Sequence, residues 1–179
     1  MPSSSDVVLL VDDIPDHAVH YEAALSRFGF IVRVATTGED ALRLAREAAP
    51  DCAVIDVRLP DMSGWDLCRE IRKPPSDEPP AIIVLTPDVS KVYAENSIKV
   101  GCNAWLAHPM HGDDLARTIR HVLSAEADAP ASIEEALLGV KRCPVCESEN
   151  VRATLRVGAA QYYCCNACSF RWRADMARD

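Results

Sequence analysis

Five short, mainly apolar runs are spaced along the first 107 residues of this 179-residue sequence. Each run is four or five residues long, and few polar residues interrupt it. Continuous apolar runs of this length are typical of strands covered on both faces, as in a parallel sheet. The pattern therefore predicts buried strands at Val7 to Val11, Ile31 to Ala35, Cys52 to Ile55, Ala81 to Leu85 and Ala104 to Ala107.

The segments after these runs carry apolar residues at intervals of three and four, which is the spacing of an amphipathic helix. Strand and helix alternate five times, which predicts right-handed crossovers and a doubly wound α/β fold with a five-stranded parallel sheet. Ligands of such folds bind outside the carboxyl ends of the strands, where the strand order reverses. The helical patterns are Ala18, Tyr21, Leu25 and Phe28; Ala41, Leu44, Ala45 and Ala48; Trp65, Leu67, Cys68 and Ile71; Val92 to Val100; and Leu115, Ile119, Val122 and Leu123.

The chain divides into a large amino-terminal part and a small cysteine-rich part. We expect one domain over residues 1–124, a linker with a short helix over 125–140, and a separate module over 141–179. The linker begins in a stretch rich in Ala, Asp and Pro, and Ser132 with Glu135 forms a capping-box pattern that starts its helix.

Charge is distributed unevenly between the two parts. Residues 1–140 contain 12 basic and 23 acidic side chains, a net charge of −11, whereas residues 141–179 contain 7 and 4, a net charge of +3. Because nucleic-acid phosphates are bound by Lys and Arg, the acidic part argues against broad nucleic-acid binding. The basic module leaves such binding open locally.

Three aspartates stand at the ends of two predicted strands. Asp12 and Asp13 follow the first strand and Asp56 ends the third, so the strand order 2-1-3-4-5 would bring them together where that order reverses. Grouped carboxylates repel one another unless a cation neutralises them, and Mg²⁺ is the expected ion. A carboxylate beside such an ion is also a nucleophile that can accept a phosphoryl group. Taken singly, each aspartate is better explained by a structural role, Asp12 and Asp13 as helix N-cap and loop residues and Asp56 as an ordinary strand end, whereas together they favour a functional site.

Further residues around this cluster form a recognisable set. They are Val11-Asp12-Asp13, Asp56 followed by Leu59-Pro60-Asp61-Met62-Ser63-Gly64, Thr86 at the end of the fourth strand and Trp105 in the fifth. These residues resemble the bacterial response-regulator receiver domain, the CheY-like family. The resemblance covers residues 1–124 and implies the doubly wound sheet with order 2-1-3-4-5.

The resemblance implies a role for each residue of the cluster. Asp56 would accept a phosphoryl group from a partner histidine kinase. Asp13 would bind Mg²⁺ directly with help from Asp12, and the backbone carbonyl of Arg58 would complete the protein's metal contacts. Thr86 would hydrogen-bond the phosphoryl oxygen.

The fifth strand and its end carry a further expectation and two departures from the family pattern. Trp105 would be the aromatic residue whose rotamer follows Thr86, although plain core packing explains it equally well. His108-Pro109 stands where receivers have Lys-Pro, and Pro87 follows Thr86 where a small residue is usual. Imidazole is shorter than a lysine side chain and mostly neutral near pH 7, and proline fixes the backbone.

These departures leave three interpretations open. The first is a receiver that still accepts phosphate at Asp56 but couples it weakly to a conformational change. The second is a pseudo-receiver that binds partners without a phosphate cycle. In the third, His108 is a metal ligand together with the aspartates.

The other four histidines show no paired metal spacing with the aspartates and are predicted to be surface or helix residues: His17, His20, His111 and His121.

Five of the eight cysteines fall within 26 residues of the small module. Cys143 with Cys146 and Cys165 with Cys168 form two C-x₂-C pairs separated by 18 residues, the spacing of a structural zinc site. Four thiolates suit tetrahedral Zn²⁺. Cys164 is an alternative to Cys165. Redox chemistry is the competing interpretation of such pairs, but the thioredoxin-like βαβ unit that usually accompanies it is missing here.

The residues between the cysteine pairs predict a zinc ribbon. Val151 to Val157 and Gln161 to Tyr163, separated by Gly158, have the pattern of a hairpin, and Phe170 and Trp172 continue it. So small a module cannot build a self-sufficient core, so metal binding should supply most of its folding free energy. Its basic and aromatic residues could bind nucleic acid or an acidic protein: Arg152, Arg156, Arg171, Arg173, Arg178, Tyr162, Tyr163 and Trp172.

The sequence therefore predicts a signalling adaptor that is not an enzyme, with a receiver-like domain joined to a zinc ribbon that contacts a protein partner. The alternative is a transcriptional regulator whose ribbon binds DNA, although no helix-turn-helix is visible. The longest early apolar run, Val7 to Val11, is followed at once by Asp12, which fits neither a signal peptide nor a membrane span. A cytoplasmic location is expected. Nucleic-acid binding, the oligomeric state and the kinase stay open.

Overall fold

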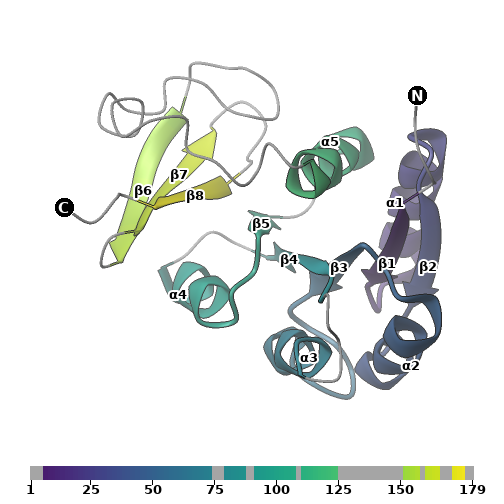
Figure 1. Cartoon of the computed structure of the whole chain (residues 1–179). Helices are drawn as coiled ribbons and strands as arrows, with labels where there is room; N and C mark the ends of the chain where they lie inside the picture. The colour runs from purple at the N-terminus through teal and green to yellow at the C-terminus, as the bar shows by residue number, and fades with distance from the viewer. Residues whose placement is uncertain are drawn as a thin grey trace.

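The structure, a computed structural model, describes residues 6–73, 79–87, 91–107, 110–124, 151–157, 160–165 and 171–175. Strand and helix alternate five times through residue 124, and three more strands follow among the described residues (Figure 1). The elements are β1 Val7–Val11, α1 Pro15–Arg27, β2 Ile31–Ala35, α2 Gly38–Ala48, β3 Cys52–Asp56, α3 Gly64–Ile71, β4 Ala81–Thr86, α4 Lys91–Lys99, β5 Ala104–Ala107, α5 Gly112–Leu123, β6 Val151–Val157, β7 Ala160–Cys165 and β8 Arg171–Asp175.

The first five strands form one parallel sheet in the order β2-β1-β3-β4-β5. This is the order that the sequence resemblance predicts. The order reverses between β1 and β3, and the two strands pair so that Val11 lies opposite Ile55. The residues that follow these two positions therefore emerge side by side at the carboxyl edge of the sheet.

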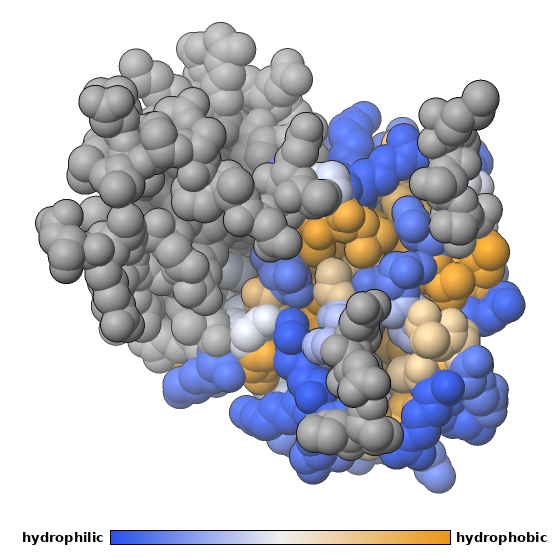
Figure 2. Space-filling view, viewed as in Figure 1, coloured by the Kyte–Doolittle hydropathy of each residue, from blue (hydrophilic) through white to orange (hydrophobic). Residues whose placement is uncertain are grey.

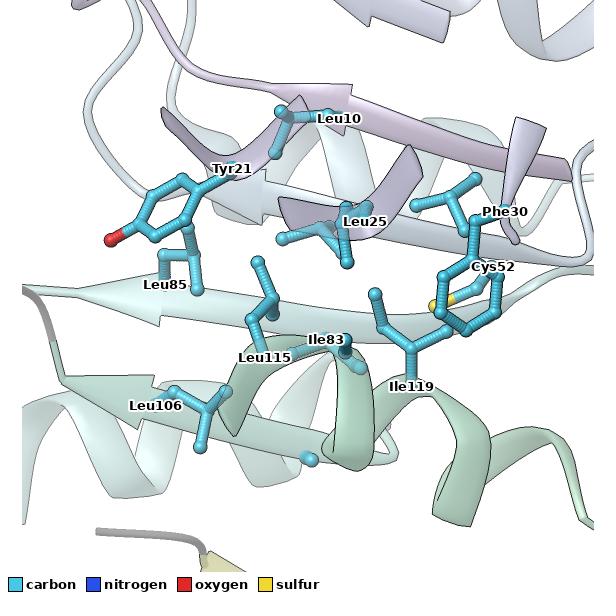
Figure 3. Packing of buried hydrophobic residues seen from close by; sticks show 14 residues of the cluster. Leu10, Tyr21, Leu25, Phe30, Cys52, Ile83, Leu85, Leu106, Leu115 and Ile119 are labelled. Atoms are coloured by element: carbon cyan, nitrogen blue, oxygen red, sulfur yellow. The ribbon is translucent and has the colours of Figure 1, made fainter. Parts of the chain in front are cut away.

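Helices cover both faces of this sheet, α1 and α5 on one and α2, α3 and α4 on the other (Figure 1). One buried cluster joins Leu25 of α1 and Leu115 and Ile119 of α5 to the sheet, where Ile83 of β4 lies against them (Figure 3). The second cluster lies under α2 and α3 and includes Leu67. The sheet is thus packed from two sides, as the apolar runs predict.

Strand β2 departs from the predicted full burial. Its exposure alternates along the strand, and Ile31 is 41% exposed. Strand β2 lies at one edge of the sheet with β1 as its neighbour, whereas β5, at the other edge, is mostly buried. Hydrophilic residues dominate much of the coloured surface in Figure 2, with hydrophobic residues between them. Within the described residues, none of the helices has the length and apolar character needed to cross a membrane.

The last three strands form a second sheet, which is antiparallel and has the order β6-β7-β8. Strand β6 has the bounds that the sequence predicts, whereas β7 is longer than predicted and ends at Cys165, opposite Val151. The predicted linker helix and the cysteines at 143, 146 and 168 lie outside the described residues. The zinc ribbon and the boundaries at 124 and 140 stay predictions.

Helices α1 and α5 approach each other closely at Gly112, the first residue of α5. A Cβ atom at this position would lie 2.3 Å from the Cβ atom of Ala24 in α1. Real carbon atoms do not approach so closely, so any side chain here would push the two helices apart. Glycine at this site therefore sets the distance between the helices.

We predict that Gly112→Ala destabilises the protein by about 1–3 kcal/mol, the usual cost of overpacking. Ala24→Gly alone should also destabilise, by about 1 kcal/mol or more, because glycine is unfavourable within a helix. In the Gly112→Ala background the second substitution removes the clash and should cost much less. Urea unfolding of all four proteins measures this coupling. Additive effects, within about 0.5 kcal/mol, would show that the two positions are not in contact.

Candidate functional site

Asp12, Asp13 and Asp56 converge at the carboxyl edge of the parallel sheet. One carboxylate oxygen from each lies within 4.8 Å of the others. Asp12 and Asp56 are buried, with 0% and 1% exposure, whereas Asp13 is exposed. Three carboxylates so close repel one another, and oxygen ligands of this kind are the donors that Mg²⁺ and Ca²⁺ prefer. The convergence that the sequence predicts is therefore present, and its donor set fits a hard divalent cation.

The loop after β3 holds Asp56 in place. Its Oδ1 atom accepts the backbone N–H of Arg58 at 2.8 Å, and the N–H of Gly64 donates to the carbonyl oxygen of Val57 at 3.0 Å. A Cβ atom on Gly64 would lie only 2.2 Å from the carbonyl oxygen of Asp56. Glycine is needed here because the start of α3 passes directly against the backbone of the site. Arg58, whose carbonyl is the predicted metal ligand, thus directly adjoins the cluster.

The loop after β1 holds Asp12. The N–H of Ile14 donates to its Oδ1 atom at 2.9 Å. Its Oδ2 atom lies 3.4 Å from Nδ1 of His17, which stands in the first turn of α1. His17 is a partly exposed helix residue, as the sequence predicts, and the structure adds that its imidazole lies beside the Asp12 carboxylate. The one sequence feature that could have indicated this contact is a histidine in the first turn of the helix that follows β1 and Asp12.

Thr86 and Trp105 lie on the neighbouring strands β4 and β5. Thr86 is fully buried, and its hydroxyl donates to the carbonyl oxygen of Leu106 at 3.3 Å. Trp105 is 2% exposed and belongs to the buried cluster under α2 and α3, so its core interpretation is correct. Its switch role is untested, and His108, which follows β5, lies outside the described residues.

The negative charge of the cluster acts on Tyr21 of α1, a residue that the sequence analysis placed only in an amphipathic helix pattern. Burial raises the pKa of the Tyr21 hydroxyl, and the negative charges of Asp12 and Asp56 raise it further, while a hydrogen bond with the backbone of Met110 acts in the opposite direction. The phenol therefore stays protonated at neutral pH. Met110 precedes α5, so Tyr21 connects α1 to the segment between β5 and α5.

Asp61 ties the loop after β3 to a different helix. Its two carboxylate oxygens accept the backbone N–H groups of Gly38 and Glu39, at 2.8 and 2.9 Å. These N–H groups begin α2 and have no partner within the helix, so the carboxylate caps it. The donated hydrogen bonds lower the pKa of Asp61 below 3.8. The loop that carries Arg58 is thereby anchored at a second point.

His20 and His111 lie apart from the carboxylates. They line a groove between α1 and α5 with a volume of about 680 Å³, together with charged residues such as Arg27 and Arg117. Neither histidine belongs to the carboxylate cluster. The prediction that they are ordinary surface or helix histidines agrees with this placement.

Comparisons with known proteins agree with this geometry. The sequence model described as the response regulator receiver domain matches residues 8–120. The transcriptional regulatory protein AfsQ1 of Streptomyces coelicolor is 37% identical over 123 residues, 69% of this chain and 52% of that protein. The aerobic respiration control sensor protein ArcB of Escherichia coli is 31% identical over 74% of this chain and 17% of its own length.

The fold comparison gives the same result. The chemotaxis response regulator CheY4 of Vibrio cholerae superposes with a TM-score of 0.63 at 28% identity, covering 66% of this chain and 99% of that one. This chain spans about half the length of AfsQ1 and less than a fifth of ArcB. The similarity therefore concerns one domain of those longer proteins.

Asp61→Asn should make the stability of the protein less dependent on pH below about 4. Because the folded pKa is lowered, the stabilising contribution of Asp61 is complete above its unfolded value, 3.8, and is lost as the pH falls through the folded pKa. The wild type should thus be more stable than the variant at pH 7, and the difference should shrink at pH 3. Urea unfolding at both pH values tests this. A difference that is constant or grows on acidification would contradict the capping role.

Proposed function

Because this chain belongs to the response regulator receiver family, we propose that it is a signalling adaptor whose Asp56 accepts a phosphoryl group from a histidine kinase. One observation supports this most directly: Asp12, Asp13 and Asp56 place their oxygens within 4.8 Å at the carboxyl edge of the sheet. The protein acts as a signalling partner rather than as an enzyme with a separate substrate. ArcB, a relative described as a sensor protein, contains a segment similar to this domain.

The geometry suits phosphoryl transfer to Asp56. An Asp56 oxygen attacks phosphorus as the phosphorus–nitrogen bond of a phosphohistidine breaks, and the released imidazole takes up a proton. Asp13 and Asp56, with the Arg58 carbonyl and help from Asp12, would hold Mg²⁺, which neutralises charge on the phosphoryl oxygens. The N–H of Arg58 already orients one oxygen of Asp56, at 2.8 Å.

The response to phosphate is proposed to be weak. Thr86 would turn its hydroxyl from the Leu106 carbonyl toward a phosphoryl oxygen, and buried Trp105 would repack in consequence. His108 supplies less charge than the lysine usual in this family, and Pro87 stiffens the chain after Thr86. If the chain did not respond to phosphate at all, it would be a pseudo-receiver, which binds partners without a phosphate cycle.

The carboxyl-terminal sheet is proposed to be a zinc ribbon that contacts a protein partner. Strand β7 ends at Cys165, opposite the first residue of β6, Val151. In the sequence, Cys146 precedes Val151 by five residues and Cys168 follows Cys165 by three, so the two C-x₂-C pairs stand next to the two ends of this hairpin segment. Two C-x₂-C pairs around a hairpin are typical of a structural zinc site.

A transcriptional regulator is the second candidate, and the name of AfsQ1 favours it. The similarity, however, covers the receiver part of this chain, so DNA binding would have to come from the carboxyl-terminal sheet. Binding of labelled DNA across a salt series separates the candidates, since phosphate contacts weaken steeply with salt. A cytoplasmic location completes the proposal.

Asp56→Asn should abolish labelling of the chain by a small phosphodonor in the presence of Mg²⁺, because an amide is not a competent nucleophile. Asp66→Asn is the matched control, since Asp66 is an exposed aspartate on α3 that contacts Arg69, and it should leave labelling unchanged. Intact-mass spectrometry measures both variants. Absence of labelling in the wild type would favour the pseudo-receiver.

The same reaction tests the proposed weak switch. Wild-type protein should show small NMR shifts at Trp105 on phosphorylation, whereas His108→Lys should enlarge them, because ammonium supplies more charge than imidazole. Signals of Trp65 and Trp172 must be assigned separately. A large wild-type response would contradict the proposal.

Zinc should be present at one equivalent per chain, bound by Cys143, Cys146, Cys165 and Cys168. Because Cys165, and not Cys164, forms a C-x₂-C pair with Cys168, we expect Cys165→Ser to lose zinc and Cys164→Ser to retain it. Elemental analysis of the purified variants measures the metal. The reverse result would make Cys164 the ligand.

A further inference from the structure

His17 is a side chain that the phospho-acceptor scheme does not use, yet it touches the carboxylate cluster. Its Nδ1 atom lies 3.4 Å from Oδ2 of Asp12, whose side chain has no exposed surface. The other oxygen, Oδ1, accepts the N–H of Ile14 at 2.9 Å. Ile14 in the loop after β1 and His17 in the first turn of α1 thus each lie next to one oxygen of the buried Asp12 carboxylate.

The imidazole is oriented by its own helix. Tyr21 follows His17 by one turn of α1, and the two ring centroids lie 6.3 Å apart at an angle of 54°. Tyr21 is buried, so the surrounding core restricts the movement of its ring, which lies beside the imidazole. Because a carboxylate only accepts hydrogen bonds, the hydrogen of His17 belongs on Nδ1. The 3.4 Å between the two atoms is slightly longer than the usual N–H···O distance of about 2.7–3.2 Å.

The direction of Asp12 matters for cation binding. Its carboxylate faces those of Asp13 and Asp56 within 4.8 Å, and a site for a small cation requires the oxygens to point at one place. An N–H of the imidazole can fix the direction of Asp12 without itself binding the cation. Hydrogen bonds that orient the groups around a metal typically change its affinity by about 10–100-fold.

We propose that His17 is a positioning residue for the divalent cation of this site, with its Nδ1–H holding Oδ2 of Asp12 toward the Asp13 and Asp56 carboxylates. This inference rests on the proposed metal-dependent phospho-acceptor function. It assigns a role to a residue of α1, an element that contributes none of the cluster's carboxylates.

Calorimetric titration of the full zinc-loaded chain with Mg²⁺ tests the proposal. His17→Ala should weaken Mg²⁺ binding by about 10–100-fold, and His17→Gln should recover part of it, because its amide can donate to Asp12. His20→Ala is the matched control, since His20 lies on the same helix and faces the groove between α1 and α5. It should bind Mg²⁺ as the wild type does.

Nitrogen NMR of the His17 imidazole gives a second readout that needs neither metal nor phosphate. The hydrogen should be found on Nδ1. An affinity of His17→Ala equal to or above that of the wild type, or a hydrogen carried only on Nε2, would overturn the role of His17 while leaving phospho-acceptance at Asp56 intact. Failure of the wild type to bind Mg²⁺ would overturn both.

Discussion

The mutual repulsion of three carboxylates at one edge of a parallel sheet is the constraint on which the proposed function depends. Strands β1 and β3 pair with Val11 opposite Ile55, so the residues that follow, Asp12 and Asp56, must emerge side by side. Both strands are buried on both faces, and their pairing cannot shift without disrupting two hydrophobic clusters. The core thus enforces a proximity that the charges oppose.

The surrounding loops direct these charges without removing them. Backbone N–H groups of Ile14 and Arg58 each donate to one buried carboxylate oxygen, at 2.9 and 2.8 Å. Gly64 allows the start of α3 to pass close to Asp56, and Asp61 anchors the same loop to α2. These contacts orient the oxygens, and in our account a cation and then a phosphoryl group use that orientation.

Much of the fold was predictable because the apolar runs and helical spacings are local patterns. The order of the strands is not local, and it was predicted only through the family resemblance around Asp12, Asp13 and Asp56. The exposure of Ile31 in β2 could not be predicted from its apolar run, since the similar run in β5, at the other edge of the sheet, is mostly buried.

The site, like the fold, was predictable in part. The aspartates and Thr86 lie at strand ends, where sequence position alone predicts their place in the fold. The contact of His17 with Asp12 depends on the phase of α1 after a loop, and the cap that Asp61 provides joins residues 22 and 23 positions apart. Neither contact leaves a periodic signal in the sequence.

The most direct test of this account is the thermal stability of wild type and Asp13→Asn in Mg²⁺-free buffer and with added Mg²⁺. Asp13 is exposed, so the substitution changes charge with little effect on packing. Without Mg²⁺ the variant should be the more stable protein, because one of three repelling charges is gone. Added Mg²⁺ should stabilise the wild type and leave the variant nearly unchanged. A variant less stable than the wild type without Mg²⁺, or a wild type indifferent to Mg²⁺, would contradict the account.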